Sequence, residues 1–380
     1  MKPIYVDNSA TSFPKAPGVS DAIKAYIDHV GCNINRGGYA QSYQLGLDVL
    51  TTRQLLCDLF NVSDPRFVVF TPGITYAINM LLEGFLQKGD HVLTTSMEHN
   101  AVMRPLHHLQ RRGVAFETIP CDINGLSNTA EIERWIKPTT KLLIMSHASN
   151  VCGTIQPIKD IYAICKKNNI KFIVDTAQTA GIIPIDAHYM DALAFTAHKG
   201  LLATQGLGGF IIKSDFAKQI SPVITGGTGS ASHEWQQPLT IPDKFESGTL
   251  NLPAIIGLKT SLTYIKQIGV SNIYDIKMKL TDKFLQAVHG NKNIRVIGNA
   301  DINNRIAVVS LDFINKDNAE VSAMLDSQYQ IMTRCGLHCA PIAHKTLQTY
   351  PHCTVRFSFG YTNTEEEIDC ILEAISLITR

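Results

Sequence analysis

Short apolar runs alternate with segments of helical periodicity over the first 260 residues of the chain. Seven of these runs predict strands, at residues 67–70, 91–95, 114–119, 141–146, 170–175, 192–196 and 209–212. Between the runs, apolar residues recur three and four positions apart, as in the segment from Ile74 to Phe85. Strands that alternate with helices are typical of a mainly parallel sheet covered by helices on both faces.

The pattern changes after about residue 260. A helical stretch at 272–289 is followed by a strand at 305–312, a helix at 319–325, a loop, a strand at 354–359 and a helix at 365–378. We therefore expect an α/β fold with a large domain over residues 15–260. A smaller α+β domain would combine residues 1–14 and 261–380. Residues 225–243, rich in Gly, Ser and Pro, predict a long loop.

Composition and charge narrow the classes of function. The chain is 45% hydrophobic and 18% charged, as globular proteins commonly are. Its formal net charge of +1 gives no indication of a surface for nucleic acid or an anionic membrane. No run reaches the roughly 20 apolar residues of a membrane span. The first residues lack the apolar core of a signal peptide, so we expect a cytoplasmic protein.

Nine cysteines are scattered along the chain without a CxxC pair, so no metal site is expected. Cys335 and Cys339 are the best pair by spacing. Cys339 is expected on a loop, where the adjacent His338 and the nearby Arg334 would favour a thiolate. The alternative is a passive loop cysteine.

Two polar residues at the ends of successive apolar runs indicate a cofactor. Asp175 ends one run, and Lys199, preceded by His198, closes the next. A lysine forms a Schiff base with the aldehyde of pyridoxal phosphate (PLP), and a carboxylate keeps the pyridine nitrogen protonated. The pair in this order predicts a PLP enzyme. A solvated lysine and a helix-capping aspartate are the alternatives.

Other polar residues also follow predicted strands, where parallel sheets bind ligands. The segment Thr71–Thr75 predicts a helix N-terminus suited to phosphate. His99 could stack on a flat ring and Asn150 could bond to it, although a loop histidine and a turn asparagine are the alternatives. Arg334 and Arg356 are either outward-facing residues or carboxylate clamps.

Taken together, these stretches resemble the class V aminotransferase family of fold-type I PLP enzymes. Within it, they are most similar to the branch of cysteine desulfurases and selenocysteine lyases. The matching pieces run nearly the whole length, at Tyr5–Ser12, Asn35–Gly37, Phe70–Thr75, Met97–His99, Ser149–Thr154, Val174–Gln178, Ala197–Lys199, Glu246–Asn251, Arg334–Pro341 and Val355–Ser358. The piece Gly336–Pro341 resembles the second subgroup of desulfurases.

The resemblance implies a role for each matching residue. Lys199 would be the Schiff-base lysine, Cys339 the nucleophile, and His99 the catalytic residue stacked on the ring. Asp175 would pair with the pyridine nitrogen and Gln178 with the ring hydroxyl oxygen. Phosphate would be bound by Ile74, Thr75, Thr196 and His198, with Thr249 contributed to the partner subunit. Substrate would contact Asn150, which also lies at the cofactor, Arg334 and Arg356.

The resemblance further implies a homodimeric cysteine desulfurase that converts L-cysteine into L-alanine and a persulfide on Cys339. A sulfur-acceptor protein would be a further partner. A selenocysteine lyase acting on L-selenocysteine and a class V transaminase are the alternatives. The chain departs from the family at Ile74, where relatives often have threonine, and at Tyr76, where they often have Glu or His. The first departure predicts weaker phosphate binding.

Overall fold

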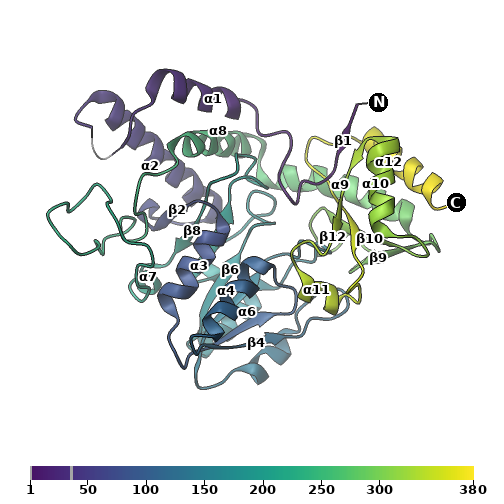
Figure 1. Ribbon diagram of the computed structural model, residues 1–380, viewed down its shortest axis with the longest axis horizontal. Coiled ribbons are helices and arrows are strands. Elements are labelled where there is room, and N and C mark those ends of the chain that lie inside the picture. The colour runs from purple at the N-terminus through teal and green to yellow at the C-terminus, as the bar shows by residue number, and fades with distance from the viewer. Residues whose placement is uncertain (1, 35–36) are drawn as a thin grey trace.

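The computed structural model describes residues 2–34 and 37–380 (Figure 1). The helices are α1 (Val19–Ala25), α2 (Ala40–Phe60), α3 (Ile74–Phe85), α4 (Asn100–Gln110), α5 (Thr129–Ile132), α6 (Ile158–Lys167), α7 (Ser214–Ala217), α8 (Leu252–Ile268), α9 (Val270–Val288), α10 (Asn318–Tyr329), α11 (Pro341–Thr346) and α12 (Glu365–Ile378). The strands are β1 (Ile4–Tyr5), β2 (Val68–Thr71), β3 (His91–Thr95), β4 (Ala115–Ile119), β5 (Thr140–Ser146), β6 (Lys171–Asp175), β7 (Ala192–Thr196), β8 (Gly208–Ile212), β9 (Ile294–Ile297), β10 (Val308–Phe313), β11 (Ile331–Met332), β12 (Arg334–Gly336) and β13 (Thr354–Ser358).

Within the described ranges, seven strands form the larger sheet in the order β2-β8-β7-β6-β5-β3-β4. Only β8 runs against its neighbours, and the pairs from β7 to β4 are parallel. This confirms the predicted α/β class with a mainly parallel sheet. All seven predicted strands lie within one residue of the observed bounds.

Two apolar layers cover this sheet because successive strand residues point to opposite faces. Leu143 and Met145 of β5 belong to the core formed with α2, α6 and α8. Leu142 and Ile144 belong to the core formed with α3, α4 and α7. In the described part of the chain, none of the helices combines the length and apolar character needed to cross a membrane.

The C-terminal part has its own core. Four of its strands form an antiparallel sheet in the order β12-β13-β10-β9, packed against α9, α10 and α12. The start of the chain joins it, and Figure 1 shows β1 beside the C-terminal elements. Strand β1 pairs with β11, and Asp7 bridges to Ser358. Helix α8 runs through residue 260 without a break, and the domain division at that position stays a prediction.

Several elements of the C-terminal part differ from the sequence-based expectation. The strand expected from residue 305 begins only at Val308, because the buried Arg305 side chain turns inward to donate hydrogen bonds to the carbonyls of Val308 and Cys152. Strand β9 was not predicted, and β11, β12 and α11 occupy part of the expected loop. Residues 225–243 contain no helix or strand, as expected.

Candidate active site

The candidate residues of the large sheet lie at one edge. Strands β2, β3, β5, β6 and β7 run in the same direction, so their carboxyl ends meet there. From these ends come Ile74, Thr75, His99, Asn150, Asp175, Gln178, Thr196, His198 and Lys199. From the small sheet and its loop, Arg356 Nη1 donates to the Asn150 carbonyl at 3.0 Å, Arg334 Nη2 lies 3.5 Å from Cys339 Sγ, and Asn100 N donates to the Cys339 carbonyl at 2.8 Å. The fold therefore brings both arginines and the thiol to this edge.

Lys199 and Asp175 are buried ionisable groups. Burial lowers the pKa of Lys199 to about 8, and the Asp175 charge partly opposes this. Burial also raises the pKa of Asp175, whose carboxylate accepts a hydrogen bond from the Ala177 backbone N–H at 2.8 Å. A buried carboxylate is costly unless a cationic or hydrogen-bonding group meets it. The pair is thus suited to a ligand that presents a cation to Asp175 and an electrophile to Lys199.

The N-terminus of α3 provides a site for an anion. The N–H groups of Ile74 and Thr75 precede the first hydrogen bonds within the helix. Gly73 caps the helix at φ 140°, a conformation that favours glycine. A Cβ on Gly208 would come within 2.8 Å of the Ile74 nitrogen, and Gly208 is in register with Thr196. Thr196 therefore lies beside this helix terminus.

Two histidines at the edge are neutral. Burial, with added effects from Lys199, lowers the pKa of His99 to about 4, and its Nδ1 accepts a hydrogen bond from Ala101 N at 3.0 Å. Burial lowers the pKa of His198 to about 4 as well. Its buried Nδ1 has no partner among the described residues. Gln178 donates one hydrogen bond from Nε2 to the Ser9 carbonyl at 3.1 Å, which leaves its second N–H for a ligand.

Arg356 is almost fully buried, at 1% exposure, and has a carboxylate partner. Its Nη2 donates to Asp7 Oδ1 at 2.7 Å and its Nη1 to the Asn150 carbonyl at 3.0 Å. The buried Nε has no partner among the described residues. A guanidinium carries five N–H donors, so Arg356 retains capacity for a second carboxylate.

Cys339 lies on the loop between β12 and α11 and is exposed. Arg334 Nη2 lies 3.5 Å from its Sγ. Asn100 N donates to the Cys339 carbonyl at 2.8 Å, and Asn150 Nδ2 donates to the His338 carbonyl at 2.7 Å. Residues 338 and 339 both have positive φ, 50° and 57°. The loop is thus fixed to the residue that follows His99.

Two residues of this region had no predicted role. Asp7 stands in the resembling piece Tyr5–Ser12, and its pairing with Arg356 joins positions 349 residues apart, which spacing cannot reveal. Glu98 is fully buried and accepts hydrogen bonds from Thr95 Oγ1 at 2.5 Å and from Ser146 N and Oγ, each at 2.9 Å. Burial raises its pKa to about 7, and the Asp175 charge adds to this. The sequence signal that could have identified Glu98 was its position as a charged residue directly before the candidate His99.

Thr249 lies apart from these residues. It lines a small hollow with Asn33, Ile34 and Glu246 that contains none of the sheet-edge candidates. Of the piece Asn35–Gly37, residues 35 and 36 lie outside the described residues.

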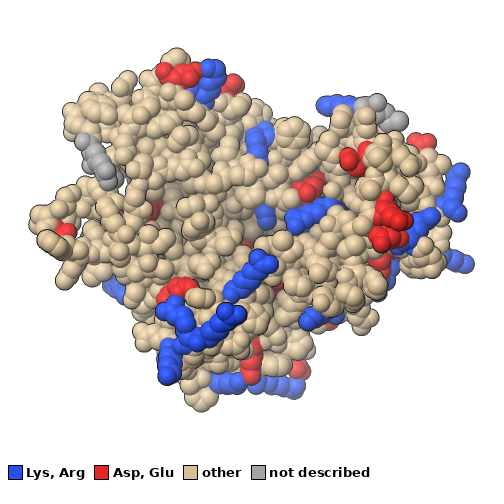
Figure 2. Space-filling model, in the orientation of Figure 1, with Lys and Arg blue, Asp and Glu red and all other residues tan. Residues whose placement is uncertain are grey.

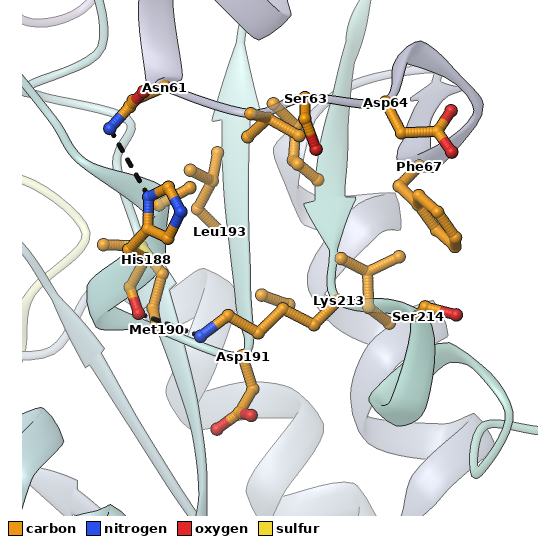
Figure 3. A pocket seen from close by; sticks show the side chains of 15 residues that line it. Asn61, Ser63, Asp64, Phe67, His188, Met190, Asp191, Leu193, Lys213 and Ser214 are labelled. Carbon is orange, nitrogen blue, oxygen red and sulfur yellow. Dashed lines mark hydrogen bonds between the residues drawn. The ribbon is translucent and has the colours of Figure 1, made fainter.

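A separate hollow of about 310 Å³ opens at the other end of the sheet, beside the start of β7 (Figure 3). Lys213 and His188 line it, and the Lys213 amine donates to the His188 carbonyl at 2.9 Å. None of the candidate residues lines it, so it is distinct from the sheet-edge site. In the view of Figure 2, acidic and basic side chains both lie on the part that contains the large sheet and on the C-terminal part.

Comparison with known proteins assigns the family. The model of the aminotransferase class-V family matches residues 4–371. The chain belongs to this family. It is 31% identical to a "Probable cysteine desulfurase" of Methanothermobacter thermautotrophicus over 381 residues, covering 99% of this chain and 94% of the relative. It is 30% identical to "Cysteine desulfurase IscS" of Vibrio campbellii, with 98% and 92% covered.

Solved structures agree with this family assignment. The apo structure of a cysteine desulfurase from Thermococcus onnurineus superposes with a TM-score of 0.93 at 28% identity, covering 100% of this chain and 95% of that one. The cysteine desulfurase CsdA of Escherichia coli superposes with a TM-score of 0.88 at 24% identity, covering 99% and 94%, and supports the fold alone. The predicted class V resemblance and the fold-type I architecture are confirmed.

Proposed function

We propose that this class-V family member is a PLP-dependent cysteine desulfurase that converts L-cysteine into L-alanine and retains the sulfur as a persulfide on Cys339. The observation that carries the proposal is the exposed Cys339 thiol, 3.5 Å from Arg334 on a loop that is hydrogen-bonded to Asn100 and Asn150 at the sheet edge. A transaminase needs no such thiol. The names of the relatives favour the desulfurase over the selenocysteine lyase alternative.

The residues present fit PLP. The Asp175 carboxylate is buried beside a buried amine, and free N–H groups begin α3. When bound, PLP supplies an aldehyde that bonds to amines and a ring that accepts electrons. In this proposal Lys199 would hold the aldehyde, Asp175 would pair with the ring nitrogen and His99 would stack on the ring. The remaining contacts would come from Gln178 and Asn150 to the ring, and from Ile74, Thr75, Thr196 and His198 to the phosphate.

The protein side chains account for the proton and sulfur transfers. A lysine whose pKa is about 8 is partly neutral near pH 7, so Lys199 can take the Cα proton of the substrate. Arg356, already paired with Asp7, offers its remaining N–H donors to the substrate carboxylate. The Cys339 thiol would lose its proton and attack the substrate sulfur. The carbon–sulfur bond would break with its electron pair left on the carbon, which a proton converts into the methyl group of L-alanine, and Cys339 would keep the sulfur as a persulfide. Arg334 holds the thiol for this attack.

We propose a homodimer in which Thr249 reaches the phosphate site of the partner subunit. Thr249 lies outside its own sheet-edge site. Tyr43, Leu47 and Leu50 of α2 are 66%, 55% and 49% exposed and lie three or four residues apart on one helix face. Such an apolar stripe is suited to a subunit contact. Sedimentation should give twice the chain mass, and Thr249→Ala should weaken PLP retention; a monomer with full PLP occupancy would contradict this.

The decisive experiment records the absorbance spectrum of the purified protein and then adds L-cysteine with a reductant. We expect a visible band and equal amounts of sulfide and alanine. Cys339→Ser should keep the band and lose sulfide formation, whereas Cys370→Ser, at another exposed cysteine, should keep both. Full cysteine activity in Cys339→Ser would refute the nucleophile assignment.

The same measurements separate the alternatives. Selenide release from L-selenocysteine that survives in Cys339→Ser, with little sulfide from L-cysteine in the native protein, would favour the lyase. A band without sulfide, together with consumption of an α-keto acid, would favour the transaminase. The sulfur-acceptor partner and the cytoplasmic location stay predictions.

A further inference from the structure

Two thiols meet outside the sheet-edge site. Cys335 Sγ donates to Cys353 Sγ at 3.1 Å, and both cysteines are half-buried. Cys335 of β12 lies opposite Val355 of β13, so Cys353, two residues before Val355, is on the same face of the strands. Sequence spacing had favoured Cys335 and Cys339 as the pair, but the antiparallel register places Cys353 beside Cys335 instead.

The same strands carry the substrate-binding candidates on their other face. Arg334 and Arg356 are opposite each other in the register, one position from Cys335 and Val355. Strand β12 has three residues and is the outer strand of its sheet, so β13 is its one neighbour there. It leads directly into the Cys339 loop. A covalent bond across this edge would fix the strand that carries Arg334.

We propose that Cys335 and Cys353 form a redox-active dithiol that reacts with small-molecule disulfides and is separate from Cys339. A Cys353 thiolate attacks one sulfur of the small disulfide and releases the first small thiol. The Cys335 thiol then loses its proton, attacks the mixed disulfide and releases the second. The protein gives up two protons and two electrons and gains one sulfur–sulfur bond, while the small disulfide is reduced to two thiols.

The environment of Cys335 assigns it the second step of the reaction. Burial, together with Cys353, raises the pKa of Cys335 to about 12, which keeps it protonated until the mixed disulfide forms. Half-burial of both thiols admits a small molecule.

Peptide mapping of the full-length, cofactor-loaded protein tests the proposal. The protein is treated with oxidised glutathione, free thiols are alkylated, and tryptic peptides are analysed without reduction. Cleavage after Arg334, Lys345 and Arg356 yields peptides 335–345 and 346–356. We expect these two peptides to be joined by a disulfide. Finding them separate, with each cysteine alkylated or glutathionylated, would overturn the proposal.

Variants assign the bond, since peptide 335–345 also contains Cys339. The link should persist in Cys339→Ser and in the matched control Cys370→Ser, and should be absent in Cys335→Ser and Cys353→Ser. Loss of the link in Cys339→Ser would show that Cys339 is the bonded residue and refute the proposal. Because the measurement shows which peptides are joined by a disulfide, it does not depend on desulfurase activity.

Hydrogen exchange tests the structural consequence. In Cys339→Ser, amide exchange of residues 334–336 should slow at least several-fold on oxidation and recover on addition of dithiothreitol. Equal exchange rates in the linked and reduced forms would disprove that the bond fixes β12.

Discussion

The buried carboxyl group of Glu98 should make the free energy of unfolding depend on pH, and a single substitution should remove this dependence. This carboxyl group is fully buried, and burial raises its pKa from 4.5 to about 7. A raised carboxyl pKa means that the folded state resists ionisation, so the free energy of unfolding falls as the pH rises from 4.5 through 7. The shift of about 2.5 pKa units corresponds to about 3 kcal/mol. Most of this loss is expected between pH 5 and pH 8.

Glu98→Gln keeps the shape of the side chain and removes its titration. We expect the native protein to lose roughly 2 to 3 kcal/mol more stability between pH 5 and pH 8 than this variant. Reversible urea unfolding of both proteins at the two pH values measures the double difference, in which the titration of other groups largely cancels. Glu131→Gln, at an exposed carboxylate, should behave like the native protein. Parallel pH dependence in native protein and Glu98→Gln would refute the reasoning.

Three further substitutions test the sheet-edge site. Lys199→Ala should abolish both the visible absorbance band and turnover, and a persisting band would reject the Schiff-base assignment. Asp7→Asn removes the anion beside the buried Arg356 and should lower the free energy of unfolding by about 2 kcal/mol. The loss should be smaller at saturating L-alanine, because its carboxylate can pair with Arg356. Urea unfolding with and without L-alanine measures both values. Arg334→Gln should slow sulfide formation about tenfold, equivalent to about 1.4 kcal/mol, without changing the absorbance band; unchanged single-turnover rates would show that Arg334 does not hold the thiol.

The periodicity of apolar residues along the sequence predicted those helices and strands in which this periodicity is not interrupted. The predicted strands at 91–95 and 192–196 coincide with β3 and β7, and the final helix coincides with α12, because their apolar periodicity is uninterrupted. Strand β12 escaped prediction because its residues Arg334, Cys335 and Gly336 carry no apolar run. Its existence depends on pairing with β13, a tertiary effect.

The positions of candidate site residues could be predicted where a residue type suited to the chemistry directly follows a predicted strand. Lys199 and Asp175 follow apolar strands, and the fold places both at the sheet edge as expected. The contacts of Asp7 with Arg356 and of Cys335 with Cys353 depend on which strands become neighbours. Spacing along a sequence carries no information about such register. The catalytic roles of Lys199 and Asp175 stay proposals.

The place of β1 has a consequence for the order in which the protein can assemble during synthesis. Residues 4–7 are synthesised long before their partners Ile331, Met332, Arg356 and Ser358. The large sheet can form while translation continues, but Asp7 has no Arg356 to pair with until residue 356 has been synthesised. A nascent chain halted before residue 356 would therefore contain the lysine end of the site without its substrate clamp. A substitution in β1 would therefore act on a late step of assembly, although β1 is synthesised early.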